Sequence, residues 1–494
     1  MINYKELPKG VLHINLIQIF STVGYAVLMG LLNFYLTNYI GISKIEANTL
    51  TSSFFAINFL FHFLGGAVGG RYLSFRGLFF VSLFLQFVGL CLIAIHTKAI
   101  VLMGMATFIT GSGLNVSCIN MMLTQLFDQN DKRRRIAFSV NYSFMNIGFV
   151  ASFFIAGYLQ GIGSYSAAFY FAAICLLIAT VIHLSAWKYV NDKSTYFVET
   201  FSLLDKKFFV APLIIIGCLI FAYVLMHHPV FASYLIYVAF IAILIFMLIF
   251  AARQSHQYKL KIYVYLILSV ASMVFACVQG LQSTALENFV EFNTTKLLFG
   301  IPMAPATVNM FESLGVIIFG IILAMMMKRR QRNNNPYQPG FLVVKGLAVY
   351  VIAFLMIPLG IFLAGGGKSN VIFPILLLII VAMGEIHVNA VNYAMAGEMM
   401  DPKHQGLFTG YLFLNVAFGI NLAGPISNYA IGSTSNSSTA TLSYQATNPM
   451  YMHIFLVMAL VAFIIAAVFF VLIRFLNNIL AEATPKDILE SEII

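Results

Sequence analysis

The sequence predicts an all-α membrane protein that crosses the bilayer many times. Hydrophobic residues make up 61% of its 494 residues and charged residues only 9%, against about 25% charged residues in an ordinary globular protein. So few charges cannot cover a water-exposed surface, which excludes a soluble enzyme, a disordered chain and a secreted disulfide scaffold. Long apolar runs recur along the chain, and the Lys and Arg residues lie in the short gaps between them. This pattern is typical of membrane topology and argues against a nucleic-acid-binding protein, despite the net charge of +10.

The amino-terminal region predicts that the first apolar helix is retained. A polar segment, residues 1–10, leads into an apolar run of about 30 residues, which is too long for the core of a signal peptide. The five cysteines lie inside apolar stretches and show no CxxC spacing. We therefore expect neither a disulfide framework nor a zinc site.

Fourteen apolar stretches reach the length of about 20 residues that a helix needs to cross a bilayer. Their centres lie near residues 25, 58, 86, 112, 148, 175, 217, 241, 273, 315, 352, 383, 419 and 461. An even number of spans places both termini on the same side of the membrane. If that side is the cytoplasm, only Lys44, Lys98, Lys296 and Lys368 of the 27 Lys and Arg residues face outward. This asymmetry predicts that both termini are cytoplasmic.

The longest inward connection and the spans that follow it predict a 6 + 2 + 6 arrangement. Residues 188–207 follow six spans, and two further spans then precede another basic loop. Two six-helix bundles around a central path are the arrangement of the major facilitator superfamily. The inserted hairpin has no acid, Lys or Arg in its spans, so we expect a peripheral structural element. The expected parts are an N-terminal bundle at 1–190, a linker and hairpin at 191–261, a C-terminal bundle at 262–478 and a cytoplasmic tail at 479–494.

Two acids, Glu312 and Glu385, lie near the interior of predicted spans. A charge in hydrocarbon is costly, so each acid is a candidate functional residue. Glu385 and Asn389 are four residues apart, and with Asn392 they make one polar stripe that we expect to face a cavity. The alternative is a structural acid that is held protonated or hydrogen-bonded between helices.

Other polar residues give weaker indications of a site. Gln18, Ser21, Thr22 and Tyr25 recur at helical spacing on the first span, and Asn146 and Gln282 lie on the fifth and ninth. Such residues line a cavity or form ordinary interhelical hydrogen bonds, and the sequence leaves both open. No Walker loop, GxSxG or HExxH pattern occurs. We therefore expect no enzyme activity, no cofactor and no metal.

Several segments resemble the proton-dependent oligopeptide transporter (POT) family. The similar segments are Gly65–Gly69 with Arg71 and Tyr72, Gly111–Leu114, Phe138–Gly148, Phe275–Asn293, and Gly384-Glu385 followed by Met399–Leu414. The inserted hairpin is also typical of bacterial members. The resemblance covers nearly the whole chain and implies an integral protein of the bacterial inner membrane.

The sequence departs from the family pattern on its first and fourth helices. Members carry a Glu-x-x-Glu-Arg motif on the first helix, where this chain has Gln18, Ser21 and Thr22, with the downstream aromatic kept as Tyr25. The fourth-helix Lys of the family falls on Val116. The binding Glu of the tenth helix is retained as Glu385, and the eighth-helix Asn aligns with Glu312. The acids thus remain while the opposing bases are missing.

The resemblance implies proton-coupled symport of di- and tripeptides or related amine-bearing molecules by alternating access. Without the bases, we expect a cationic, amine-bearing or carboxyl-blocked substrate, or one whose carboxylate meets neutral donors. The expected substrate-binding residues are Gln18, Ser21, Thr22, Tyr25, Asn146, Gln282, Glu312, Glu385 and Asn389. Glu312 and Glu385 are also expected to carry the protons, because two neighbouring buried carboxyls do not readily ionise together.

Two alternatives remain open at this point. One is an exporter or uniporter of a different small, cationic solute, and the other is a transporter-derived receptor or scaffold. Retained buried acids argue against the scaffold, since it has no use for them. The expected partners are the substrate, protons and membrane lipid, without nucleic acid, and we expect a monomer.

Overall fold

The computed structural model of the protein describes residues 7–128, 131, 133–193, 195–200, 209–333, 339–394, 400, 404–432 and 442–483. It is helical almost throughout, and the chain divides into two compact units, one that ends at Ser233 and one that begins at Tyr234. The units are treated separately below.

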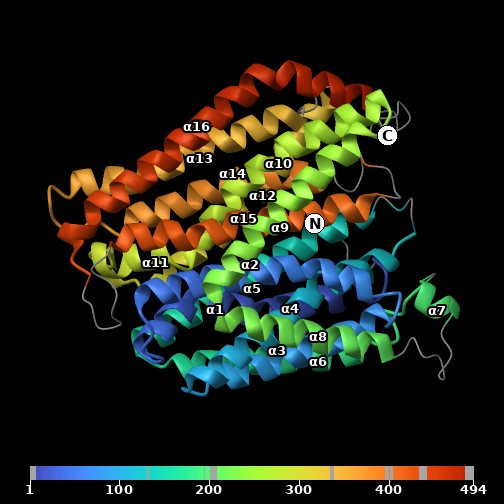
Figure 1. Ribbon diagram of the computed structural model, residues 1–494, viewed down its shortest axis with the longest axis horizontal. Helices are drawn as coiled ribbons and strands as arrows, with labels where there is room; N and C mark the ends of the chain where they lie inside the picture. Colours follow the sequence, from blue (N-terminus) through green and yellow to red (C-terminus); the bar gives the residue numbers. More distant parts are fainter. Residues whose placement is uncertain are drawn as a thin grey trace. The chain divides into compact units, whose positions relative to one another are not determined.

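The first unit is built from long apolar helices (Figure 1). Its elements are α1 (Val11–Asn38), α2 (Lys44–Val68), α3 (Phe75–Ile93), α4 (Lys98–Gln125), α5 (Arg133–Gly161), α6 (Tyr165–Ser185), the short α7 (Tyr196–Thr200) and α8 (Val210–His227). Helix α1 packs against α5 and α6, α2 against α4, and α3 against α4 and α6.

Local sequence signals set two of these helix starts. The Ser43 side chain accepts a hydrogen bond from the Glu46 amide, and the Ser74 side chain accepts one from the Gly77 amide, both at 3.2 Å. These are N-caps, which satisfy amides that have no partner within the helix. Close contact between α2 and α4 requires Gly113, where an added Cβ atom would lie 2.3 Å from Phe61 Cβ.

The second unit repeats this pairing of helices. Its elements are α10 (His256–Gln282), α11 (Ala285–Asn288), the π-helical turn η3 (Phe289–Asn293), strands β1 (Leu297–Leu298) and β2 (Ile301–Pro302), α12 (Pro305–Arg332), α13 (Pro339–Leu363), α14 (Ile372–Ala394), α15 (Gln405–Ile431) and α16 (Tyr444–Ala483). Helix α10 packs against α15 and α16, α12 against α14, and α13 against α14 and α16. Six helices in each unit therefore follow one packing order.

Thirteen helices of the described residues are long and apolar enough to span a membrane, and the apolar part of α14, Ile372–Val388, is shorter. The chain is an integral multi-pass membrane protein, and the all-α prediction is confirmed. One small addition is the antiparallel pair β1–β2, in which Leu297 pairs with Pro302.

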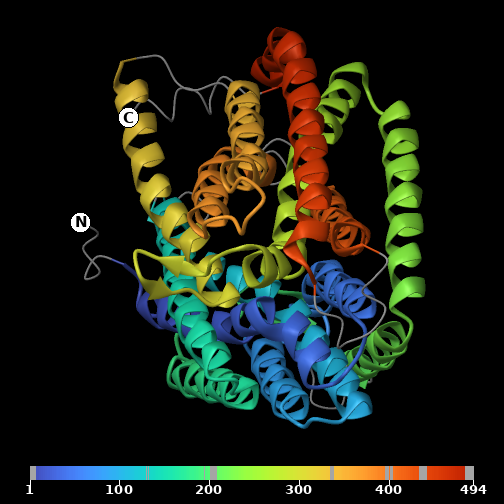
Figure 2. The ribbon, with the colours of Figure 1, turned by 90° about the vertical axis from the view of Figure 1, so that its left-hand side faces the viewer.

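The inserted hairpin consists of α8 and α9, and the chain passes from the first unit to the second within it (Figure 2, green). Helix α8 packs against α4 and α2, and in the same unit Ser53 Oγ lies 3.0 Å from Ser233 Oγ. Helix α9 (Pro229–Ala252) passes the division at Ser233, and its later residue Phe240 stacks on Phe418 of α15 with ring centroids 4.3 Å apart. The three-part division predicted at residues 190 and 261 stays a prediction.

Helix α10 is interrupted just after Gln282. Ser283 and Thr284 leave helical geometry, with φ −139° and ψ −93° at Thr284, before α11 resumes for one turn. The π-helical turn η3 follows directly. Broken helices and π turns in membrane proteins are frequent at functional sites.

Candidate functional site

A buried hydrogen bond joins two predicted site residues, Gln282 and Glu312. Gln282 Nε2 donates to Glu312 Oε2 at 2.6 Å, which connects the end of α10 to the first part of α12. Gln282 is inaccessible to solvent and Glu312 is 7% exposed. Because a carboxylate oxygen only accepts, this bond fixes the amide with its nitrogen toward Glu312.

The second predicted acid, Glu385, belongs to the same unit. It lies on α14, which packs against α12, and its side chain is also 7% exposed. Glu312 and Glu385 interact electrostatically, and the interactions found for Glu312 among the described residues include no Lys or Arg. The unit therefore brings two acids together without a cation beside Glu312.

Tyr350 on α13 is a residue of this cluster that sequence reasoning missed. Its ring lies against the backbone of Gly384, where an added Cβ atom would be 2.3 Å from Tyr350 Cε1. The Tyr350 hydroxyl is buried without a hydrogen-bond partner among the described residues, and it interacts electrostatically with both Glu312 and Glu385. A tyrosine within an apolar run gives little signal, since its ring is compatible with lipid or core packing.

Asn309 was also missed, and it lies one turn before Glu312 on α12. Its side chain is buried, and its Nδ2 has no hydrogen-bond partner in the described part of the chain. The signal was its spacing of three residues from Glu312, which places both side chains on one face of the helix. Predicted residue Asn389 lies on α14, but its side chain, like that of Asn392, is outside the described residues.

The first unit groups the predicted polar residues of α1. Gln18 Nε2 donates to Thr22 Oγ1 at 3.4 Å, while the Thr22 hydroxyl donates to the Gln18 carbonyl oxygen at 2.7 Å. The Ser21 hydroxyl donates to the same carbonyl at 3.5 Å. Both hydroxyl protons are thus used by the α1 backbone, and Gln18 Oε1 remains buried without a partner in the residues described.

Tyr25 and Asn146 occupy different surroundings from that group. The Tyr25 ring packs edge-on against Phe55 and Phe149, with centroid distances of 5.2 and 6.1 Å. Asn146 Nδ2 donates to the Tyr142 carbonyl oxygen within α5 at 3.0 Å. These contacts fit ordinary packing between helices as well as the wall of a cavity.

The unmatched buried atoms at the predicted positions are all hydrogen-bond acceptors. They are Gln18 Oε1, Gln282 Oε1 and Glu312 Oε1, none of which has a partner among the described residues. A buried polar atom without a partner is costly, by about 1–3 kcal/mol. Gln18 in the first unit, and Gln282 and Glu312 in the second, are therefore each suited to a group that brings N–H or O–H donors.

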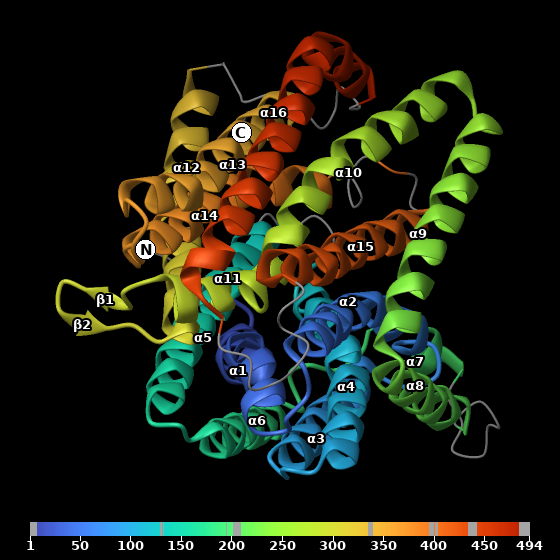
Figure 3. The same cartoon turned by 60° about the vertical axis from the view of Figure 1, so that its left-hand side comes forward.

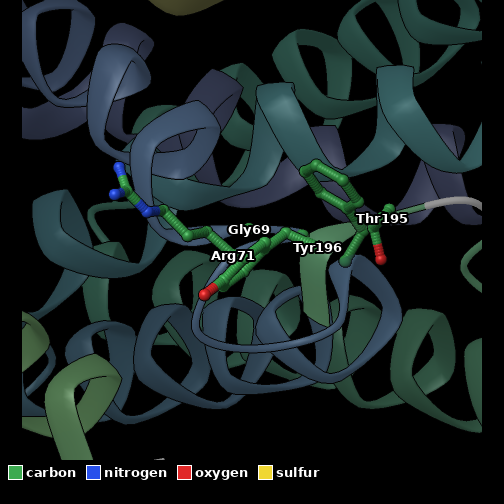
Figure 4. A pocket seen from close by; sticks show the side chains of 6 residues that line it. Gly69, Arg71, Thr195 and Tyr196 are labelled. Carbon is green, nitrogen blue, oxygen red and sulfur yellow. The ribbon is translucent and has the colours of Figure 1, made fainter. Parts of the chain in front are cut away.

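A separate pocket lies at the loop between α2 and α3 (Figure 4). It has a volume of about 480 Å³ and is lined by Gly69, Gly70, Arg71, Phe75, Thr195 and Tyr196. The Arg71 guanidinium points away from Thr195. None of the predicted substrate residues lines this pocket, so it is distinct from the candidate site.

The linker before α7 is fixed to the same loop. Both carboxylate oxygens of Asp192 accept from the Phe75 amide, at 3.0 and 2.9 Å, and the Phe197 amide donates to the Gly70 carbonyl oxygen at 2.8 Å. Burial raises the pKa of Asp192 above its ordinary value, and the hydrogen bond from the Phe75 amide opposes this shift. Within the described residues, no group of three or more His, Cys, Asp or Glu side chains is arranged to hold a metal ion.

The fold and the family model together define the class of this protein. Residues 14–328 match the model of the Major Facilitator Superfamily. The chain belongs to this superfamily of transporters.

Within the superfamily, the similarity lies with peptide permeases. The chain is 25% identical over 470 residues to dipeptide and tripeptide permease A of Klebsiella pneumoniae, covering 94% of this chain and 92% of the relative. It is 26% identical over 492 residues to the permease of the same name from Cronobacter turicensis, covering 98% and 96%. The resemblance to POT transporters seen in the sequence is confirmed.

Solved structures of peptide transporters have the same fold. One is a peptide transporter POT in complex with sulfate, which matches with a TM-score of 0.81 at 19% identity and covers 97% of each chain. Another is a POT family transporter in complex with 5-aminolevulinic acid, with a TM-score of 0.81 at 18% identity, covering 95% of this chain and 97% of the other.

Proposed function

We propose that this protein is a proton-coupled secondary transporter that moves di- or tripeptides, or related amine-bearing small molecules, by alternating access. The relatives are named dipeptide and tripeptide permeases, which supports a peptide-like substrate. The repeated packing order of the two units supports the 6 + 2 + 6 plan and the alternating-access mechanism that the superfamily implies.

The observation that carries this proposal is the set of unmatched acceptor oxygens around Glu312. Glu312 Oε1 and Gln282 Oε1 are buried without partners in the described residues, and Glu385 adds a second acid nearby. A substrate ammonium brings three N–H donors and one positive charge, which matches this need. The substrate amine therefore binds at Glu312 and Glu385 in our proposal, with Gln282 bonded to Glu312 and Asn389 of α14 as a further predicted ligand.

We propose that a substrate carboxylate contributes less to binding than the substrate amine. Gln18, Ser21 and Thr22 stand where relatives of the POT family carry charged residues, and the two hydroxyls donate to the α1 backbone. Only the Gln18 amide keeps an uncommitted N–H in that group, because Nε2 has two protons and uses one for Thr22. We propose that Gln18, Ser21, Thr22, Tyr25 and Asn146 make the neutral part of the site.

The proton is carried by Glu312 and Glu385 in this proposal. Two neighbouring buried carboxyls are more stable with at least one proton bound. With one carboxylate paired to the substrate ammonium and the other acid still protonated, substrate and proton are bound together and move in the same direction. We also propose that the protein lies in the bacterial inner membrane with both termini in the cytoplasm, and that it is a monomer.

Uptake into proteoliposomes tests the proposal directly. We expect Ala-Ala accumulation to increase when the lumen is alkaline relative to the outside, and to fall to the uncoupled level when a protonophore is added. Accumulation that is indifferent to the pH gradient would favour the uniporter. No flux of any amine-bearing probe would favour the receptor or scaffold.

A competition pair tests the substrate end groups. Ala-Ala amide keeps the amine and lacks the carboxylate, so we expect it to compete for uptake at least as well as Ala-Ala. N-acetyl-Ala-Ala has no ammonium and is expected to compete poorly. The reverse order of the two blocked peptides would contradict the assignment of Glu312 and Glu385 to the amine.

A further inference from the structure

A third acid, Glu287, is buried in the second unit and has no role in the proposed substrate site. It lies on α11, just beyond the interruption of α10 at Ser283 and Thr284, and is 2% exposed. Figure 3 shows α11 beside α16 and close to the β1–β2 pair. The Tyr451 hydroxyl of α16 donates to the Ala285 carbonyl oxygen at 3.1 Å, which fixes this turn in place.

Neither carboxyl oxygen of Glu287 has a hydrogen-bond partner among the described residues. The donors around it are used elsewhere. Ser427 Oγ donates to Thr284 Oγ1 at 2.8 Å, and Asn288 Nδ2 donates to the Thr284 carbonyl oxygen at 3.0 Å. A carboxylate buried without a hydrogen-bond partner is strongly unfavourable, so the neutral acid is the form that fits this conformation.

Among the residues that the structure describes, no charge compensates Glu287. Helix α11 packs against α10, α12, α15 and η3. The titratable groups on the adjoining turns of these elements and of α16 are Cys277, Glu291, Glu312, Tyr429, Tyr451 and His453. Glu291 is paired with Lys296 at 2.7 Å, and Glu312 is bonded to Gln282. Within the described residues, no charged or titratable group interacts electrostatically with the Glu287 carboxyl.

We propose that Glu287 is a proton-binding site of the transport cycle, separate from Glu312 and Glu385, which holds its proton in the conformation described here. This inference rests on the proposed function for its coupling role. The broken helix allows the segment that carries Glu287 to change conformation, because Ser283 and Thr284 can alter their backbone angles without disturbing a continuous helix. When the segment moves and water reaches Glu287, its carboxyl ionises and the proton leaves.

Chemical labelling tests whether Glu287 holds a proton, independently of transport. Dicyclohexylcarbodiimide reacts with protonated carboxyls in apolar surroundings, and peptide mass spectrometry locates the modified residue. In purified full-length protein at neutral pH we expect labelling at Glu287, and none at Glu46, an exposed acid paired with Lys98 at 2.9 Å. An unlabelled Glu287 under conditions that label a known buried carboxyl in a reference protein would overturn the proposal.

Transport by Glu287→Gln tests the coupling role. Glutamine is the neutral isostere of the protonated acid, so we expect loss of accumulation driven by a pH gradient, with exchange of Ala-Ala across membranes without a gradient retained. Glu287→Asp, which still titrates, should restore part of the driven accumulation, and Glu46→Gln should resemble the wild type. Gradient-driven accumulation unchanged in Glu287→Gln would overturn the coupling role while leaving the proposed function intact. A wild type that exchanges no Ala-Ala would contradict the proposed function, and labelling would still decide the proton site.

Discussion

Asp192 caps the first turn of α3 from a distant part of the sequence, because both of its carboxylate oxygens accept from the amide of Phe75. Helix N-termini leave several amides without intrahelical partners, and a negative group is favourable there. This acid belongs to the linker before α7, 117 residues after Phe75 in the sequence. The linker thus stabilises the loop that precedes α3.

Removing this cap should weaken the first unit. We expect Asp192→Ala to lower the free energy of unfolding by about 1 kcal/mol, because the Phe75 amide loses its acceptor. Asp192→Asn keeps one acceptor oxygen and should recover part of the loss. Thermal unfolding in detergent measures both variants, with the exposed acid Glu199 of α7 as a matched control. A loss of stability in Glu199→Ala equal to that in Asp192→Ala would contradict the capping role.

The stability of the wild type should also depend on pH through Asp192. Burial raises the pKa of Asp192 in the folded protein, whereas an unfolded aspartate titrates near pH 4. Between these two values the folded state binds more protons than the unfolded state, so stability falls as pH rises through this window. Asp192→Asn lacks this titration, so the difference in melting temperature between wild type and variant should shift in favour of the variant from about pH 4 upward. A difference that stays constant across the range would rule out the raised pKa.

The bond between Gln282 and Glu312 should contribute to both stability and transport. In Gln282→Ala, Glu312 Oε2 loses its partner, and we expect a cost of about 1–3 kcal/mol in unfolding free energy. Accumulation of Ala-Ala should fall as well, because Glu312 is no longer held in place. Gln279→Ala, three residues earlier on α10, is the control and should behave like the wild type. Equal effects of the two substitutions would mean that the bond has no specific role.

Gly384 should tolerate no side chain, while Gly320 should. An added Cβ atom at Gly384 would lie 2.3 Å from the Tyr350 ring, so Gly384→Ala must displace Tyr350 or α14. We expect a loss of about 1–3 kcal/mol in stability and reduced transport, since Glu385 is the next residue. At Gly320 on α12, no atom lies within 4 Å of the added Cβ, and alanine should stabilise this helix by about 0.5–1 kcal/mol. Melting temperatures of the two variants that move together would contradict this reading.

The sequence predicted the membrane fold and the two acids for the same reason. Charge in hydrocarbon is rare, so the apolar runs mark the spans, and Glu312 and Glu385 stand out within them. The partner of Glu312 was not predictable, because Gln282 lies 30 residues away and their meeting depends on how α10 and α12 are rotated. Glu287 was missed because the interruption of α10 leaves no trace in hydropathy, and Tyr350 because its ring resembles the apolar residues around it.

The unused oxygens of Gln282 and Glu312 bear on the choice of inhibitors. Compounds that present several N–H groups in one plane, such as amidines and guanidines, can satisfy both oxygens without being carried through the cycle like a flexible peptide amine. Affinity across such a series should follow the number of donors, and acidic groups at the same end of the molecule should abolish it. A medicinal chemist would therefore begin from cationic fragments and leave the peptide carboxylate out.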